Sequence, residues 1–385
     1  MFRPRRGFCQ NWAWFILSST LYGSWILGLF PFIFNCRKKQ LSLSRCLRLY
    51  GLILNFFLLF ILIYISFETE KPSKLEAFER NPLLEKINIL IGIMSVISAI
   101  VVHLMNFLRS NQILRIINEL LALEYRHFGA MNLWNCPKLN CFVIQKSVTI
   151  IAVMLTLMGV HHAMPGNITN FWTSLLMCLT QVGLNLKVLH CYLGVLFIYR
   201  NVWLINGQLL ELVHQSIPMT DLISARIREL LSIYRHLLEL NKKLQTAYEL
   251  HMTLILLSGF AGNIVVVFFL IVFEFSMNKP SIFLVVFIHS LLLNIWDFWL
   301  SIVVCDLTEK TGQETSAILK LFCNEENLDV ELERNINEFA WLCSHAKFRF
   351  RLFGMFSVNY NMGFNTIITS FLYLLYLVQF DFKNL

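Results

Sequence analysis

The sequence is poor in charged residues. Asp, Glu, Lys and Arg make up 15% of its 385 residues, whereas apolar types make up 57%. A soluble globular chain carries about a quarter charged residues, so a soluble domain is excluded. The chain also lacks a Walker loop, a GxSxG or an HExxH motif, which argues against an enzyme. No CxxC or mixed His/Cys spacing indicates a metal site, so we expect neither metal nor cofactor.

The apolar residues fall into blocks of about 20, the length an α-helix needs to cross the hydrocarbon core. This pattern predicts an all-α fold, a polytopic membrane protein with seven transmembrane helices. The predicted spans are 49–67, 87–107, 143–163, 171–198, 252–275, 281–305 and 354–378.

An eighth apolar block, 12–34, is harder to place. If it does not cross and the N-terminus is cytoplasmic, the inside segments hold 24 of the 32 Lys and Arg residues and the outside segments hold 6. That contrast satisfies the positive-inside rule. A crossing block would instead expose a basic flank outside. We therefore favour a segment lying in the membrane plane or partly buried, with a crossing helix as the alternative.

The excess of basic over acidic residues does not indicate nucleic-acid binding. The formal net charge is +8, but Lys and Arg lie between apolar blocks rather than in one patch, and no recognition module accompanies them. Asn167 begins a glycosylation sequon in a predicted outside loop. All ten cysteines fall in cytoplasmic segments or spans, so no pair is available for an extracellular disulfide.

Three amphipathic stretches lie on the predicted cytoplasmic side, at 111–123, 221–250 and 328–343. The second has apolar residues at alternating spacings of three and four, a heptad seam that includes Asn241. It continues without a helix breaker into the span at 252, which predicts one long helix. The seam packs either on its own chain or between subunits. Three helices with wide apolar faces need partners, so we expect a packed cytoplasmic base.

The last span carries a polar stripe. One 80° sector of the helix holds the residues Asn361, Asn365, Thr369, Leu372, Tyr376 and Gln379. Such a stripe faces water or packs against a polar neighbour. Its length favours a water-filled path.

Polar residues in other spans give two further hypotheses. Lys187 and Asp297 lie at matched depth, which allows an intramembrane ion pair, although Lys187 could instead extend to the inner surface. The outer halves of the spans contain candidate ligand-pocket residues, for which the alternative is an interfacial belt. They are His161, His162, Trp172, Gln181, Glu274 and His289.

Residues 372–380, with the sequence LYLLYLVQF, resemble the Thr-Tyr, five hydrophobics, Gln-Phe motif of insect gustatory receptors. The departure is Leu372, where the family has Thr. Segments 27–32, 78–84, 294–300 and 339–343 are similar to one fruit-fly subfamily assigned to bitter taste.

This resemblance implies a ligand-gated cation channel for small tastants. It implies a cytoplasmic N-terminus, a tetramer of identical or different gustatory subunits in lipid, and a location in the plasma membrane of gustatory neurons. It also implies that the final helix forms the pore, that Gln379 and Phe380 constrict it, and that Tyr373 supports the helix. A hydrophobic ring that opens by movement is a known gating device.

The resulting organisation has four parts: an N-terminal segment at 1–48, six spans with cytoplasmic extensions at 49–305, an anchor region at 306–353 and the pore helix with the C-terminus at 354–385. Two rival functions remain. A receptor coupled to G proteins needs an outside N-terminus, which the charge bias opposes. A transporter commonly shows internal repeats and broken helices, and the sequence has neither.

Overall fold

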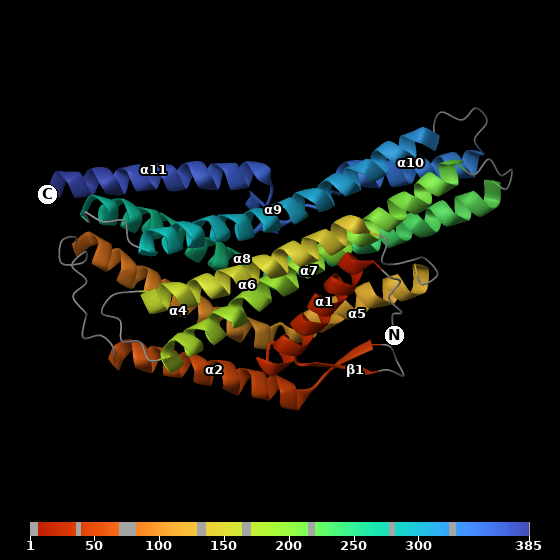
Figure 1. Cartoon of the computed structure of the whole chain (residues 1–385). Helices are drawn as coiled ribbons and strands as arrows, with labels where there is room; N and C mark the ends of the chain where they lie inside the picture. The colour runs from red at the N-terminus through yellow and green to blue at the C-terminus, as the bar shows by residue number, and fades with distance from the viewer. Residues whose placement is uncertain are drawn as a thin grey trace.

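The computed structural model describes residues 7–35, 40–68, 82–128, 136–163, 171–214, 220–276, 282–322 and 329–384. These residues form an elongated helical bundle (Figure 1). The helices are α1 (Phe8–Ile26), α2 (Arg45–Glu68), α4 (Pro82–Leu108), α5 (Ser110–His127), α6 (Pro137–Ala163), α7 (Phe171–His214), α8 (Thr220–Ser276), α9 (Ile282–Phe322), α10 (Val330–His345) and α11 (Tyr360–Asn384).

The helices divide the bundle into two halves along its length. The long helices α7, α8 and α9 run through both, whereas α2, α4 and α11 occupy one half and α5 and α10 the other (Figure 1). We call the half with α11 the membrane half and the half with α10 the base. Five helices are long and apolar enough to cross a membrane, and the pair α4–α5, bent by 62°, makes a sixth, within the part of the chain that the structure describes.

The long helix predicted over 221–250 and the following span is confirmed. Helix α8 is continuous over 57 residues. The predicted heptad seam is buried within this chain: Leu230, Tyr234 and Leu237 are all at most 1% exposed. Tyr234 donates a hydrogen bond to the carbonyl of Gly312 at 3.2 Å and packs edge-on against Phe339 of α10. The seam therefore belongs to an intramolecular bundle, because its period matches the facing helices of the same chain.

Two short antiparallel hairpins were not predicted. The strands β1 (Phe32–Asn35) and β2 (Gln40–Leu43) pair with Phe32 opposite Leu43, between α1 and α2. The strands β3 (Arg351–Leu352) and β4 (Phe356–Ser357) precede α11. The predicted span 354–378 therefore starts too early, since its helix begins at Tyr360. The block 12–34 is also not one helix, because α1 ends at Ile26.

Helix α1 and the first hairpin are fastened to the bundle by close contacts. Gly28 has a positive φ of 64°, and its carbonyl lies against Gly51 of α2 so closely that a Cβ on Gly51 would be 2.0 Å from it. Trp25 Nε1 donates a hydrogen bond to the carbonyl of Phe32 at 3.0 Å. Glycine at both positions lets the two backbones meet.

Candidate functional site

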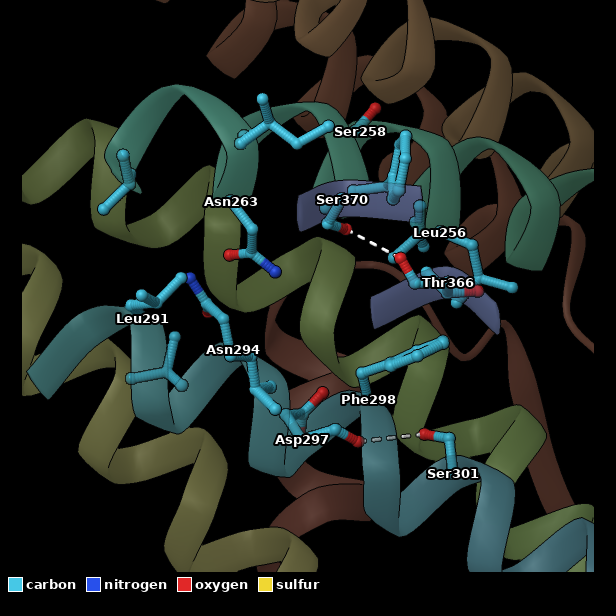
Figure 2. A pocket seen from close by; sticks show the side chains of 18 of the residues that line it. Leu256, Ser258, Asn263, Leu291, Asn294, Asp297, Phe298, Ser301, Thr366 and Ser370 are labelled. Atoms are coloured by element: carbon cyan, nitrogen blue, oxygen red, sulfur yellow. Dashed lines mark hydrogen bonds between the residues drawn. The ribbon is translucent and has the colours of Figure 1, made fainter. Parts of the chain in front are cut away.

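A cavity of about 540 Å³ lies in the membrane half, between α4, α6, α7, α8, α9 and α11 (Figure 2). Its walls are mainly aliphatic and aromatic, including Phe260, Phe298 and Phe371. The volume and apolar character match those of small-molecule sites in proteins, which typically enclose about 300–1,000 Å³. The cavity forms because the membrane halves of these helices contain small side chains at facing positions, such as Gly259 and Gly262 of α8.

Polar groups enter this apolar space from α4, α7, α8, α9 and α11. Asn263 of α8 and Asn294 of α9 point into the gap between their helices (Figure 2). Thr366 and Ser370 contribute hydroxyls from α11, and each donates to a carbonyl one turn earlier on its own helix at 2.8 Å. The two amides therefore offer hydrogen bonds to a ligand more readily than the two hydroxyls, whose protons are already used.

One ion pair lies at the edge of the cavity. Lys146 of α6 is 0% exposed, and its Nζ lies 2.7 Å from Oδ1 of Asp297, whose side chain is 26% exposed. The same ammonium donates to the carbonyl of Asp297 and to Oγ of Ser301, both at 3.1 Å. The ammonium therefore has one ionic partner and two hydrogen-bond acceptors. A low-dielectric site makes such pairing necessary, because an isolated buried charge is costly.

The predicted pair between Lys187 and Asp297 is therefore wrong. Lys187 of α7 is buried and donates to the carbonyl of Leu29 at 2.7 Å and to Oδ1 of Asn106. It connects α7 to the link between α1 and β1 and to α4. Equal depth did not bring the two charges together, because each faces a different neighbour. Lys187 does not extend to the membrane surface either.

The polar stripe of the last span is exposed in the single chain. Tyr376 is 70% exposed and Leu372 is 61% exposed, and Asn361, Asn365, Thr369 and Gln379 are exposed as well. By contrast, Leu374 on the other side of α11 is buried and packs near Phe268 of α8. Exposure on α11 is not confined to the stripe, because Phe364 and Phe371 are 61% and 60% exposed. The side of α11 that faces its own bundle includes the hydroxyl residues Thr366 and Ser370 as well as Leu374.

The remaining predicted residues are distributed as follows. Gln181 lines the cavity, whereas His289 is exposed and does not line it. Tyr373 is exposed on α11 and packs edge-on against Phe260 at 6.3 Å. Asn167 lies outside the described residues, and the same holds for the side chains of Phe380, His161, His162, Trp172 and Glu274.

Sequence reasoning missed most of the polar cavity residues. No sequence pattern singled out Lys146, Asn263, Asn294 or Ser370. The signal that could have found them is a lone polar side chain in the middle of an apolar span. Such residues commonly face a bundle interior or a water-filled cavity.

Comparison with known proteins places this geometry in context. A family described as 7tm chemosensory receptor matches residues 17–384. A Drosophila melanogaster protein provisionally named gustatory receptor 22b is 56% identical over 96% of both chains. The same organism's gustatory receptor for bitter taste 22e is 39% identical over the full length of both.

A solved structure shares the fold. The insect olfactory receptor OR5 from Machilis hrabei matches with a TM-score of 0.67 over 94% of this chain and 97% of its own, at 10% identity. The same receptor in complex with eugenol matches with a TM-score of 0.66 at 11% identity, over 95% of this chain and 99% of its own. The prediction of an all-α, multi-pass membrane protein is thereby confirmed.

Proposed function

Because the chain belongs to the 7tm chemosensory receptor family and is a gustatory receptor by its relatives, we propose that it is a subunit of a ligand-gated cation channel. Its ligand is a small tastant, bitter or aversive, and it acts in the plasma membrane of gustatory neurons. The observation that carries this proposal is the polar stripe of α11, which is exposed in the single chain.

A polar stripe facing lipid is unfavourable, since hydrocarbon offers no hydrogen bonds. The stripe therefore needs water or neighbouring subunits. Copies of α11 arranged around a symmetry axis provide both, because a closed ring lets each subunit contribute one stripe to a shared pore. A tetramer, of this chain alone or with other gustatory subunits, places Asn365, Thr369, Tyr376 and Gln379 towards that pore. Phe380 then forms the narrow gate beside Gln379.

The cavity supports a small organic ligand. One structural neighbour binds eugenol and one relative is named for bitter taste, and the cavity here is of a suitable volume and largely apolar. Ligand in the cavity touches Thr366 and Ser370 on the inner side of α11, opposite the stripe. A ligand that fits the open position of α11 better than the closed one shifts the population towards the open state.

The test is patch-clamp recording from cells that express the chain with partner gustatory subunits and are challenged with bitter compounds. We expect a ligand-evoked cation current whose relative ion permeability changes in Gln379→Ala. The matched control is Gln313→Ala, because Gln313 is exposed in the base and far along α9 from the stripe. Signalling that requires G proteins and is the same in Gln379→Ala would overturn the channel proposal.

A further inference from the structure

Asp297 is the one charged side chain among the described residues that line the cavity. The remaining polar groups of the lining are neutral amides and hydroxyls. In a largely apolar space, a single carboxylate dominates the local field. Its state and orientation therefore decide which ligands the cavity accepts.

The ion pair with Lys146 holds this carboxylate in place. Lys146 is fully buried and does not line the cavity, whereas Asp297 does. The ammonium thus lies behind the carboxylate as seen from the cavity. Its ion pair with Asp297 and its hydrogen bonds to Asp297 and Ser301 hold it in place behind the carboxylate.

The ion pair is accordingly a fixed dipole with its negative end towards the cavity. A ligand group that contacts the free side of the carboxylate at about 2.8 Å is nearer to the negative charge than to the ammonium behind it. The net field at that position attracts a cation and repels an anion. Asn294, one helical turn earlier on the same face of α9, can accept or donate a further hydrogen bond beside it.

We propose that Asp297, held by Lys146, is the specificity-determining residue of the cavity and that it selects small ligands with an apolar body and a protonated amine. The apolar walls bind the body of the ligand, and Asp297 accepts a hydrogen bond from the amine. Ligands of the same size that carry a carboxylate are excluded. This inference rests on the proposed function for the cavity being the ligand site, but it does not require the chain to conduct ions.

The test measures the field in the cavity without a known tastant. Asn294→Cys places a thiol about one turn from Asp297. The purified receptor in lipid nanodiscs is treated with aminoethyl methanethiosulfonate, a cation, or with sulfonatoethyl methanethiosulfonate, an anion. Modification of residue 294 is followed by peptide mass spectrometry, and each rate is divided by the rate of the same reagent with a free thiol.

We expect the cationic reagent to react at least about tenfold faster than the anionic one, as a charge difference at this range implies. Adding Asp297→Asn should bring the ratio to one or below, because the ammonium of Lys146 then lacks its counter-charge and favours the anionic reagent. The double change Lys146→Met with Asp297→Asn should bring the ratio close to one, and it avoids leaving an unpaired ammonium if the single variant fails to fold. The control Asp306→Asn removes a carboxylate from the same helix outside the cavity and should leave the ratio unchanged.

If the two reagents modify the Asn294→Cys variant at equal relative rates, the inference is overturned. It is also overturned if the preference for the cationic reagent is unchanged when Asp297→Asn is added. Lack of reaction with both reagents would also overturn it, because the cavity would then be closed to molecules of this size. Failure of the channel proposal is distinguishable, since it appears as missing ligand-evoked current while the labelling ratio is retained.

Discussion

The buried pair of Lys146 and Asp297 predicts an unequal response to removing either partner. Asp297→Asn leaves an ammonium that is 0% exposed without its counter-charge, which costs about 3–5 kcal/mol of stability in comparable buried pairs. Lys146→Met leaves a carboxylate that opens onto the cavity and can be hydrated there, so its cost should be smaller. The double variant should be close to wild type, because it removes both buried charges and keeps the volume similar.

Thermal unfolding of the purified receptor in nanodiscs, followed by intrinsic tryptophan fluorescence, measures the relative stabilities of the three variants. The control is Lys310→Met, since Lys310 pairs with Asp306 at 2.8 Å but is 60% exposed, and such a surface pair contributes about 0–1 kcal/mol. A double variant as unstable as Asp297→Asn would refute the reasoning, as would two single variants with wild-type stability. The first result would mean that the surrounding packing, and not the pairing of charge, holds this site together.

Three further predictions concern other parts of the chain. Gly51→Ala should lower the free energy of unfolding by about 1–3 kcal/mol or more, because its Cβ meets the backbone of Gly28, whereas Gly92→Ala, with nothing within 4 Å, should be nearly neutral. Lys187→Met should cost about 1–3 kcal/mol in the same unfolding assay, because it leaves Oδ1 of the buried Asn106 without its donor, whereas the carbonyl of Leu29 still accepts from Nδ2 of Asn106. Burial raises the pKa of Cys343 to about 11, so its alkylation by iodoacetamide should be slow at pH 8 and rise about tenfold per pH unit towards that value; a fast, pH-independent reaction would contradict this burial.

The features predicted correctly from the sequence were those whose apolar pattern repeats over several helical turns. The heptad seam of 221–250 contains no Gly or Pro and continues directly into the span at 252. It therefore predicted that α8 is continuous and which face of its first part is buried. The amphipathic stretches at 111–123 and 328–343 became α5 and α10 for the same reason. A wide apolar face repeated over several turns has few ways to be buried.

The features missed were short or depended on which helices are neighbours. Strands β3 and β4 have two residues each, and Phe356 of β4 was included in the predicted span that begins at 354. The error over Lys187 had a different cause. Depth in the membrane follows from position along a helix, but the neighbour that a side chain meets depends on rotation about the helix axis and on the packing order. Lys146 faces α9 and Lys187 faces α4, and neither fact is encoded locally.

Packing is distributed unevenly between the two halves, and this bears on how a ligand could act. The main core of buried side chains is concentrated where α7, α8, α9 and α10 meet, whereas α8 and α11 share in the membrane half a small core centred on Phe268 and Leu374. The cavity lies beside that small core. Regions with few buried apolar contacts open at lower free energy than the main core. Under the proposed function, a ligand in the cavity would act beside this small core, where α11 packs on α8, while the main core holds the long helices together.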